Sequence, residues 1–378
     1  MRGKRCLLTV VAAVLLMPSV SRADVSPRLF DVYNAARGLS DNSAQTIRCT
    51  RTGRLVITTM GQINFFDGNK FCYIDPTNEN TYTLSDYYGN YHLYFDKYHH
   101  LWLKNTHSVT CVDLSTEVFV KSVSDVFAEF GVKEKVKDMF VDNNGVVWLL
   151  TASGLYSVET KATFKVRDSN LQDMEVYKDK YLLLCYGNGE TDVVEQSTGK
   201  VLYVGKPYGT PDYAKYDRSS VLCIDGNSCY QIRNGAKEAI LLRFDILKSE
   251  WTTLLKTPYH LNNVTVQDST LYMPCEYGYW TYDLKTGKAV QYDKVRLLRG
   301  REVSTDMNAL AFDKQGGMWV GTETLGLMYY RPFNVPFVTY TWEDKKAWDY
   351  AEMMEKLPQQ QQYRDKYVNC VYRDSRGW

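Results

Sequence analysis

A repeated turn motif is the feature that most limits what this chain can fold into. It consists of an alternating apolar strand, an Asp, two polar residues, a Gly and then, six places after the Asp, a Trp that begins another apolar strand. Residues 136–148 and 307–319 keep every part of it, and Asp96 with Trp102 keeps the spacing. An Asp at a turn accepts hydrogen bonds from downstream backbone N–H groups, and the Gly supplies the positive φ of a tight hairpin. The motif therefore predicts one β-hairpin per copy.

The copies add up to seven. Four are clear and end near Met60, Trp102, Trp148 and Trp319, although the first has Thr50 and Val56 in the Asp and Trp places. Three degenerate copies centre on 181–186, 221–224 and 271–275, after shortened turns at 178–180, 217–219 and 267–269. The repeat residues that we expect to be structural are Gly53, Asp96, Trp102, Asp142, Gly145, Trp148, Asp313, Gly316, Trp319, Asp374 and Gly377.

Seven units of four strands predict an all-β protein, a seven-bladed β-propeller of four-stranded antiparallel blades. Radial closure of such an array protects the edges of its sheets. A β-solenoid is the main alternative, but its repeats are usually shorter and lack a hairpin in every copy. We expect the propeller over residues 24–340, a linker with a short helix over 341–366, and the start of a further repeat, of a second propeller, over 367–378. Because that repeat stops at Trp378, we expect the chain to be a fragment.

The N-terminus has the pattern of an export signal. Arg2, Lys4 and Arg5 precede an apolar run over residues 6–17, and Ser21-Arg22-Ala23 offers small residues for cleavage before Asp24. The apolar run is shorter than the roughly 20 residues that a membrane-spanning helix needs. We therefore predict a signal peptide over residues 1–23 and a periplasmic mature protein.

Composition excludes some partners and leaves others open. The net charge of +1 gives no electrostatic basis for binding nucleic acid or an anionic membrane. The 30 tyrosines suit pleated strands, and their faces could also stack on sugars, although packing accounts for most of them. No Cys or His spacing indicates a metal site, and we expect no cofactor.

The cysteines are expected to be mainly buried thiols. Most of them lie singly within apolar strand patterns, where cysteine acts as a small hydrophobic residue. Cys223 and Cys229 flank the turn residues 225–227, which could place them opposite each other, so a disulfide between them stays open.

The repeat resembles the two-component-regulator propeller repeat. Residues 313–322 match its Asp-x-x-Gly-x-x-Trp-x-Gly-Thr pattern best, and 37–43 with 64–68 are similar to the first blade of such arrays. In that family the repeats form the periplasmic sensor region of hybrid two-component histidine kinases, with two propellers ahead of a membrane helix and a kinase. The resemblance implies a downstream second propeller and kinase as partners, a glycan-derived ligand such as an oligosaccharide, and dimers of the full receptor. No kinase motif is present in this chain, so we do not expect it to be an enzyme.

Candidate ligand-binding residues lie in two sets of loops at one end of the strands. One set joins the second and third strands of a blade, and the other precedes each inner strand. These loops combine aromatic rings with amides and carboxylates, which suits a sugar ligand, although loops are polar in any case. The candidates are Asn42, Asn105, His107, Glu190, Asn262, Glu276, Tyr277, Asp306 and Glu323. Asn42 and Asn308 could instead cap turns.

Two other functions remain open. A secreted propeller enzyme that cleaves polysaccharide, a lyase or hydrolase, would need two acids about 5–10 Å apart, and Glu276 with Glu323 or Asp306 could supply them. A protein-interaction scaffold would need no such pair. The sensor is the function that the resemblance favours.

Overall fold

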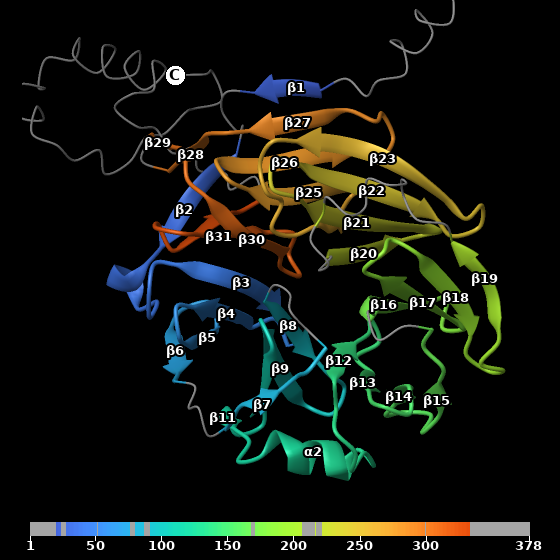
Figure 1. Cartoon of the computed structure of the whole chain (residues 1–378). Helices are drawn as coiled ribbons and strands as arrows, with labels where there is room; N and C mark the ends of the chain where they lie inside the picture. The colour runs from blue at the N-terminus through green and yellow to red at the C-terminus, as the bar shows by residue number, and fades with distance from the viewer. Residues whose placement is uncertain are drawn as a thin grey trace, which may run out of the picture.

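Seven antiparallel sheets surround a central axis in the computed structural model (Figure 1). The structure describes residues 20–23, 28–50, 52–75, 80–86, 91–167, 171–205, 216, 221–298 and 300–332. The sheets are the blades of a β-propeller, which confirms the predicted fold. In each blade the first strand lies innermost and the following strands pair outward in chain order.

Blades one to three follow the clear copies of the repeat. Blade one contains β3 (Ala44–Cys49), β4 (Leu55–Thr59), β5 (Ile63–Phe66) and β6 (Phe71–Ile74). Blade two contains β8 (His92–Phe95), β9 (His100–Asn105), β10 (Ser108–Asp113) and β11 (Val118–Phe119), and β7 (Tyr82–Thr83) also pairs with β10. Blade three contains β12 (Asp138–Val141), β13 (Val147–Leu150), β14 (Leu155–Ser157) and β15 (Thr163–Phe164).

Blades four to six come from the degenerate copies. Blade four contains β16 (Leu171–Tyr177), β17 (Tyr181–Tyr186), β18 (Thr191–Glu195) and β19 (Val201–Gly205). Blade five contains β20 (Val221–Asp225), β21 (Ser228–Asn234), β22 (Ala239–Asp245) and β23 (Glu250–Thr257). Blade six contains β24 (Thr265–Gln267), β25 (Thr270–Cys275), β26 (Gly278–Asp283) and β27 (Ala289–Tyr292).

The sequence assignment of blade five was wrong by one strand. We placed 221–224 after the inner hairpin turn, in register with 181–186 and 271–275, but β20 is the inner strand and its turn follows it. Asp225 pairs with Ser228 across the two-residue loop of Gly226 and Asn227. The error arose because this blade has no Asp motif to mark the turn. The turn that we expected at 217–219 lies outside the described residues.

Blade seven is completed by the N-terminal part of the chain. It contains β30 (Met307–Phe312), β31 (Met318–Thr322) and β32 (Leu327–Tyr330), and its fourth strand is β2 (Leu29–Tyr33). β2 pairs antiparallel with β32, so the two ends of the array are joined by a backbone ladder. The hairpin of β28 (Val295–Leu297) and β29 (Glu302–Val303) extends the same sheet beyond β2.

Three further elements lie outside the regular blades. The strand β1 (Val20–Ala23) pairs in parallel with β27 and lies immediately before the predicted cleavage site. A 3₁₀ helix over Ala35–Arg37 follows β2, and α2 (Val123–Glu129) lies between blades two and three. α2 was not expected, and its Phe127 ring stacks on Trp102 with ring centroids 5.7 Å apart.

Hydrogen bonds in three turns explain the repeated spacing of Asp and Trp. In blade three, the Oδ2 atom of Asp142 accepts a hydrogen bond from the Trp148 indole at 2.8 Å, and Oδ1 accepts two from backbone N–H groups at 2.9 Å each. Asp96 and Asp313 make the same three bonds in blades two and seven. The six-residue spacing therefore joins a turn to a buried ring, and Trp148 fills the space between blades three and four.

The cysteines in the described residues are free thiols. Cys229 pairs with Ile224 rather than with Cys223. Because neighbouring residues of a strand point to opposite faces, Cys223 and Cys229 lie on different faces of blade five, and the disulfide that we left open is not formed. Cys229 instead contacts Cys185 of blade four, and both side chains are buried.

Both ends of the chain lie outside the described residues. Residues 1–19, most of the predicted signal peptide, lie outside the described residues, as do the linker over 341–366 and the further repeat with Asp374 and Gly377. Among the residues that are described, no helix is both long and apolar enough to cross a membrane.

Candidate functional site

All nine candidate residues lie at the same end of the strands. The inner strand and the second strand of a blade run antiparallel, so the start of one lies beside the end of the other. The loops before the inner strands and the loops after the second strands therefore form one face around the axis. The structure does not gather the nine residues into one cluster, but six of them fall on three neighbouring blades.

Hydrogen bonds join polar loop residues of blades six, seven and one into one surface. We call it the rim surface and define it by Tyr277, Asp306, Asn308, Glu323 and Gln45. The backbone N–H of Tyr277 donates to Asp306 Oδ1 at 3.2 Å, and the backbone N–H of Glu323 donates to the Asp306 carbonyl at 3.1 Å. These bonds link the loop after β25, the loop before β30 and the loop after β31.

Glu323 is the centre of the rim surface. Its Oε2 atom accepts hydrogen bonds from the side-chain amides of Asn308 at 2.8 Å and Gln45 at 3.1 Å. The hydrogen bond from Asn308 is the main reason that the pKa of Glu323 is lowered. The carboxylate is therefore charged at neutral pH and held between blade seven and blade one. Asn308 also donates to the Ala44 carbonyl at 3.2 Å, so it joins the two blades instead of simply capping a turn.

An exposed aromatic ring lies beside these polar groups. Tyr277 is 52% exposed, and its φ of 59° holds it in the left-handed region. Its ring lies 5.6 Å from that of Tyr259, at an angle of 73°. Glu276, the neighbouring candidate, is also exposed. An exposed ring next to carboxylates and amides can stack on a sugar face while the polar groups bond to hydroxyls.

Two candidates, Asn42 and Asn262, form hydrogen bonds with backbone groups of neighbouring loops. Asn42 Oδ1 accepts from the Ala35 N–H at 2.9 Å, and the Asn42 carbonyl accepts from the Gly326 N–H at 2.8 Å. The side-chain amide of Asn262 donates to the Met307 carbonyl at 2.8 Å. Both side chains thus connect neighbouring loops, and a ligand would have to displace these bonds to use them.

The other three candidates lie on blades two and four. Asn105 accepts from the Ser108 hydroxyl, and His107 is exposed in the same turn. On blade four, Arg167 donates to Glu190 at 2.9 Å and to Asp192 at 2.6 Å. Asn188 and Arg167 lower the pKa of Glu190. Glu190 therefore belongs to an ion-pair cluster that is separate from the rim surface.

Sequence reasoning missed a group of buried charges near the axis. Lys104 and Asp138 form an ion pair of 2.5 Å in which both side chains are almost completely buried. Burial raises the pKa of Asp173 to about 7, and the positive charges of Lys104 and Arg233 oppose this shift. These residues come from four successive blades. A charged residue inside an apolar strand pattern, as in Leu101-Trp102-Leu103-Lys104, was the available signal.

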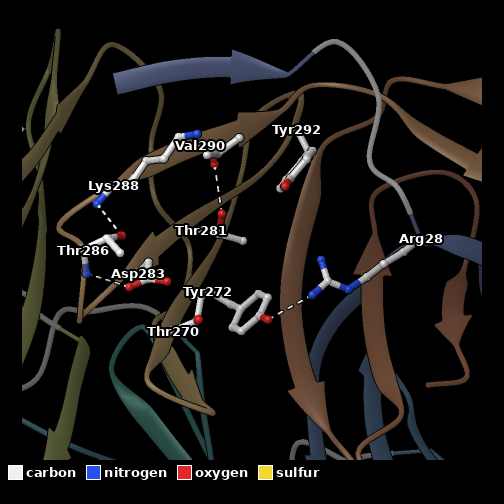
Figure 2. A pocket seen from close by; sticks show the side chains of 9 residues that line it. All are labelled: Arg28, Thr270, Tyr272, Thr281, Asp283, Thr286, Lys288, Val290 and Tyr292. Atoms are coloured by element: carbon white, nitrogen blue, oxygen red, sulfur yellow. Dashed lines mark hydrogen bonds between the residues drawn. The ribbon is translucent and has the colours of Figure 1, made fainter. Parts of the chain in front are cut away.

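No group of His, Cys, Asp or Glu in the described part of the chain has the arrangement of a metal site. Two grooves have volumes of about 360 Å³ and about 250 Å³. The larger lies at the opposite end of the strands from the rim surface, and the smaller runs along blade six from the Asp283 turn to Tyr292, the last residue of β27. Trp148 and Asn144 line the larger groove, and Figure 2 shows the smaller one. Neither contains any of the nine candidate residues.

Comparison with known proteins agrees with this fold and with the repeat. Residues 302–324 match the model of the two-component regulator propeller family, so the resemblance predicted from the motif is confirmed there. This segment contains the Asp313 turn, Trp319 and Glu323. No curated protein matches the sequence.

Solved structures extend the similarity to the whole propeller. The chain is similar to the extracellular domains of two hybrid two-component system proteins from B. thetaiotaomicron, each at 14% identity, with TM-scores of 0.55 and 0.57. The matches cover 81% and 82% of this chain but only 42% and 40% of those domains. A streptogramin B lyase is also similar, at 11% identity and a TM-score of 0.50 over 80% of this chain and 97% of the lyase. At these identities the likeness shows the propeller fold.

Proposed function

We propose that this chain is the extracytoplasmic ligand-sensing propeller of a two-component receptor and that it recognises an oligosaccharide on the rim surface. The observation that carries the proposal is the regulator repeat at 302–324, because this segment also supplies Asp306, Asn308 and Glu323. The signal would pass to a kinase outside this chain, in a receptor exported to the periplasm.

The chemistry of the rim surface suits binding. Oligosaccharides present hydroxyl groups and apolar ring faces, and the rim surface offers carboxylate and amide groups beside the exposed ring of Tyr277. Most of its polar groups are already held by bonds between loops. Such preorganisation reduces the free-energy cost of ordering side chains when a ligand binds.

The lowered pKa of Glu323 does not suit the acid of a glycosidase. A glycosidase needs one carboxylic acid that stays protonated at the working pH, and such acids have raised pKa values. The pKa of Glu323 is lowered. The enzyme alternative would therefore have to use Glu276 or Asp306 as the acid.

Calorimetry with the purified chain tests the proposal. Defined neutral and acidic oligosaccharides would be titrated in turn, and each sample would then be chromatographed for products. We expect one class to bind and to be recovered intact. Tyr277→Ala should weaken its binding about fivefold, because stacking on an aromatic ring contributes about 1 kcal/mol.

Tyr73→Ala provides the matched control. Tyr73 is 53% exposed, almost the same as Tyr277, but it lies on β6, the outer strand of blade one. Binding should be unchanged in this variant. Cleavage of the sugar by the wild-type chain would contradict a sensor and support an enzyme, and equal losses in the two tyrosine variants would contradict the rim surface as the site.

A further inference from the structure

The smaller groove lies between blades six and seven and contains none of the residues that define the rim surface. It has a volume of about 250 Å³. Figure 2 shows its side chains: Tyr272, Thr281 and Tyr292 come from strands of blade six, and Arg28 reaches in from the residue before β2. The groove therefore crosses the place where the N-terminal strand closes the ring.

Arg28 is held in a fixed position at one side of this groove. Its Nη1 atom donates to the Tyr279 hydroxyl at 3.1 Å, and its Nη2 atom donates to the Tyr272 hydroxyl at 3.0 Å. The guanidinium also lies over the rings of Tyr272 and Tyr330, at 5.4 Å and 5.5 Å from their centroids. The pKa of Arg28 is raised despite desolvation by its burial, so the group is a preorganised positive charge.

A second cation comes from the opposite side. Lys288 is exposed and lines the groove across from Arg28 (Figure 2). The carboxylate that lines the groove, Asp283, is engaged with its own turn, because its Oδ1 atom accepts from the N–H groups of Lys285 at 2.9 Å and Thr286 at 2.8 Å. The lining therefore combines two positive charges, one negative charge and several hydroxyl groups.

We propose that this groove is a second binding site and that it takes one acidic sugar unit, a hexuronate. Arg28 would bind the carboxylate, since Arg and carboxylate form strong charge-assisted bonds, and Lys288 would add positive potential from the other side of the groove. The hydroxyls of Thr281 and Tyr292 would bond to the ring hydroxyls. The volume lies just below the roughly 300–1,000 Å³ of pockets for drug-sized ligands, which suits a single sugar instead of a long oligosaccharide.

Ligand-observed NMR with the full chain tests this site. The probes are D-glucuronate, D-glucose and sodium sulfate, each titrated separately. We expect glucuronate to bind in the millimolar range and glucose to bind at least tenfold more weakly, because glucose lacks the carboxylate. Equal binding of glucose would overturn the role of the charge, and equal binding of sulfate would overturn the recognition of a sugar.

Two lysines on one turn provide matched variants. Lys288→Gln removes a cation from the groove, whereas Lys285→Gln removes one from the same exposed turn outside it. Both side chains are exposed, so both variants should fold. We expect Lys288→Gln to weaken glucuronate binding about fivefold to tenfold and Lys285→Gln to leave it unchanged; equal effects would contradict the site. Glu323→Gln on the rim surface should also leave it unchanged, so this site and the proposed sensing function can fail separately.

Discussion

Blades two, three and seven close their inner hairpins with one side chain, whereas blades four, five and six close theirs with the backbone. In blade three the loop between Val141 and Val147 has five residues, and the Asp142 carboxylate bonds to the turn and to Trp148. In blade six, Gln267 and Thr270 are joined by Asp268 and Ser269 alone, with φ values of 50° and 59°. The same four-stranded sheet thus forms from two different turns.

The two groups of blades also differ in which side chains make their polar contacts. The Asp–Trp bond spans six residues in blades two, three and seven, which we call the motif blades. Blade four instead relies on Arg167, which reaches Asp192 at 2.6 Å, and on Tyr186, whose hydroxyl donates to the same carboxylate at 3.1 Å. Blade five has Arg233, which is 1% exposed and bonds to Gln231 and to the Tyr186 carbonyl of blade four. The motif blades thus share one turn contact, whereas each degenerate blade has polar contacts of its own.

The largest effect on stability should come from removing the turn carboxylate of a motif blade. Asp142→Ala deletes three hydrogen bonds to a charged acceptor and leaves the buried Trp148 indole without its partner. We expect a loss of about 4 kcal/mol in the free energy of unfolding, measured with urea. Asp179→Ala, in the corresponding turn of blade four, should cost less than about 1 kcal/mol. Equal losses would show that the motif is not the main stabilising contact of its blade.

A smaller effect should come from pH and should arise in blade four. Burial raises the pKa of Asp173 to about 7 and that of Glu175 to about 8. Asp173 faces Lys104, Asp138 and Arg233, and Glu175 faces Asp173, Asp142 and the Asn143 N–H. In the unfolded chain both acids titrate near pH 4.

The folded state therefore binds protons that the unfolded state has lost. Stability should fall as the pH rises from about 4 to about 8 and should then level off. We expect a fall of about 2 kcal/mol, because both residues are partly exposed and water screens part of the effect. Glu175→Gln should reduce this slope in urea titrations. An unchanged slope would show that Glu175 does not titrate in this range.

The smallest effect should come from correcting a degenerate turn. Asp268→Asn with Ser269→Gly gives the sequence that two-residue hairpins prefer when both φ values are positive. We expect a gain of about 1 kcal/mol, seen as a higher melting temperature. The same Asn-Gly pair at Lys314 and Gln315 in blade seven, where neither φ is positive, should give no gain. A gain there would mean that the two turn classes do not differ as described.

The sequence predicted the motif blades well because their information is local. The spacing of Asp, Gly and Trp fixes the turn, the register and the inward ring, and all three lie within a few residues of each other. The shortened turns at 178–180 and 267–269 were also found. Blade five was shifted by one strand because Gly226 and Asn227 form a turn without the motif.

The loop face of the candidate site could likewise be predicted, because the antiparallel order of strands decides which loops share an end. Which of those loops meet was decided only by the tertiary structure. Glu323 bonds to Gln45, 278 positions away, because β2 closes the ring and brings blade seven against blade one. The ion pair of Lys104 with Asp138 and the groove at Arg28 depend in the same way on contacts between blades. Local hydrogen bonds specify each hairpin, but the angular packing of seven sheets specifies which side chains share a surface.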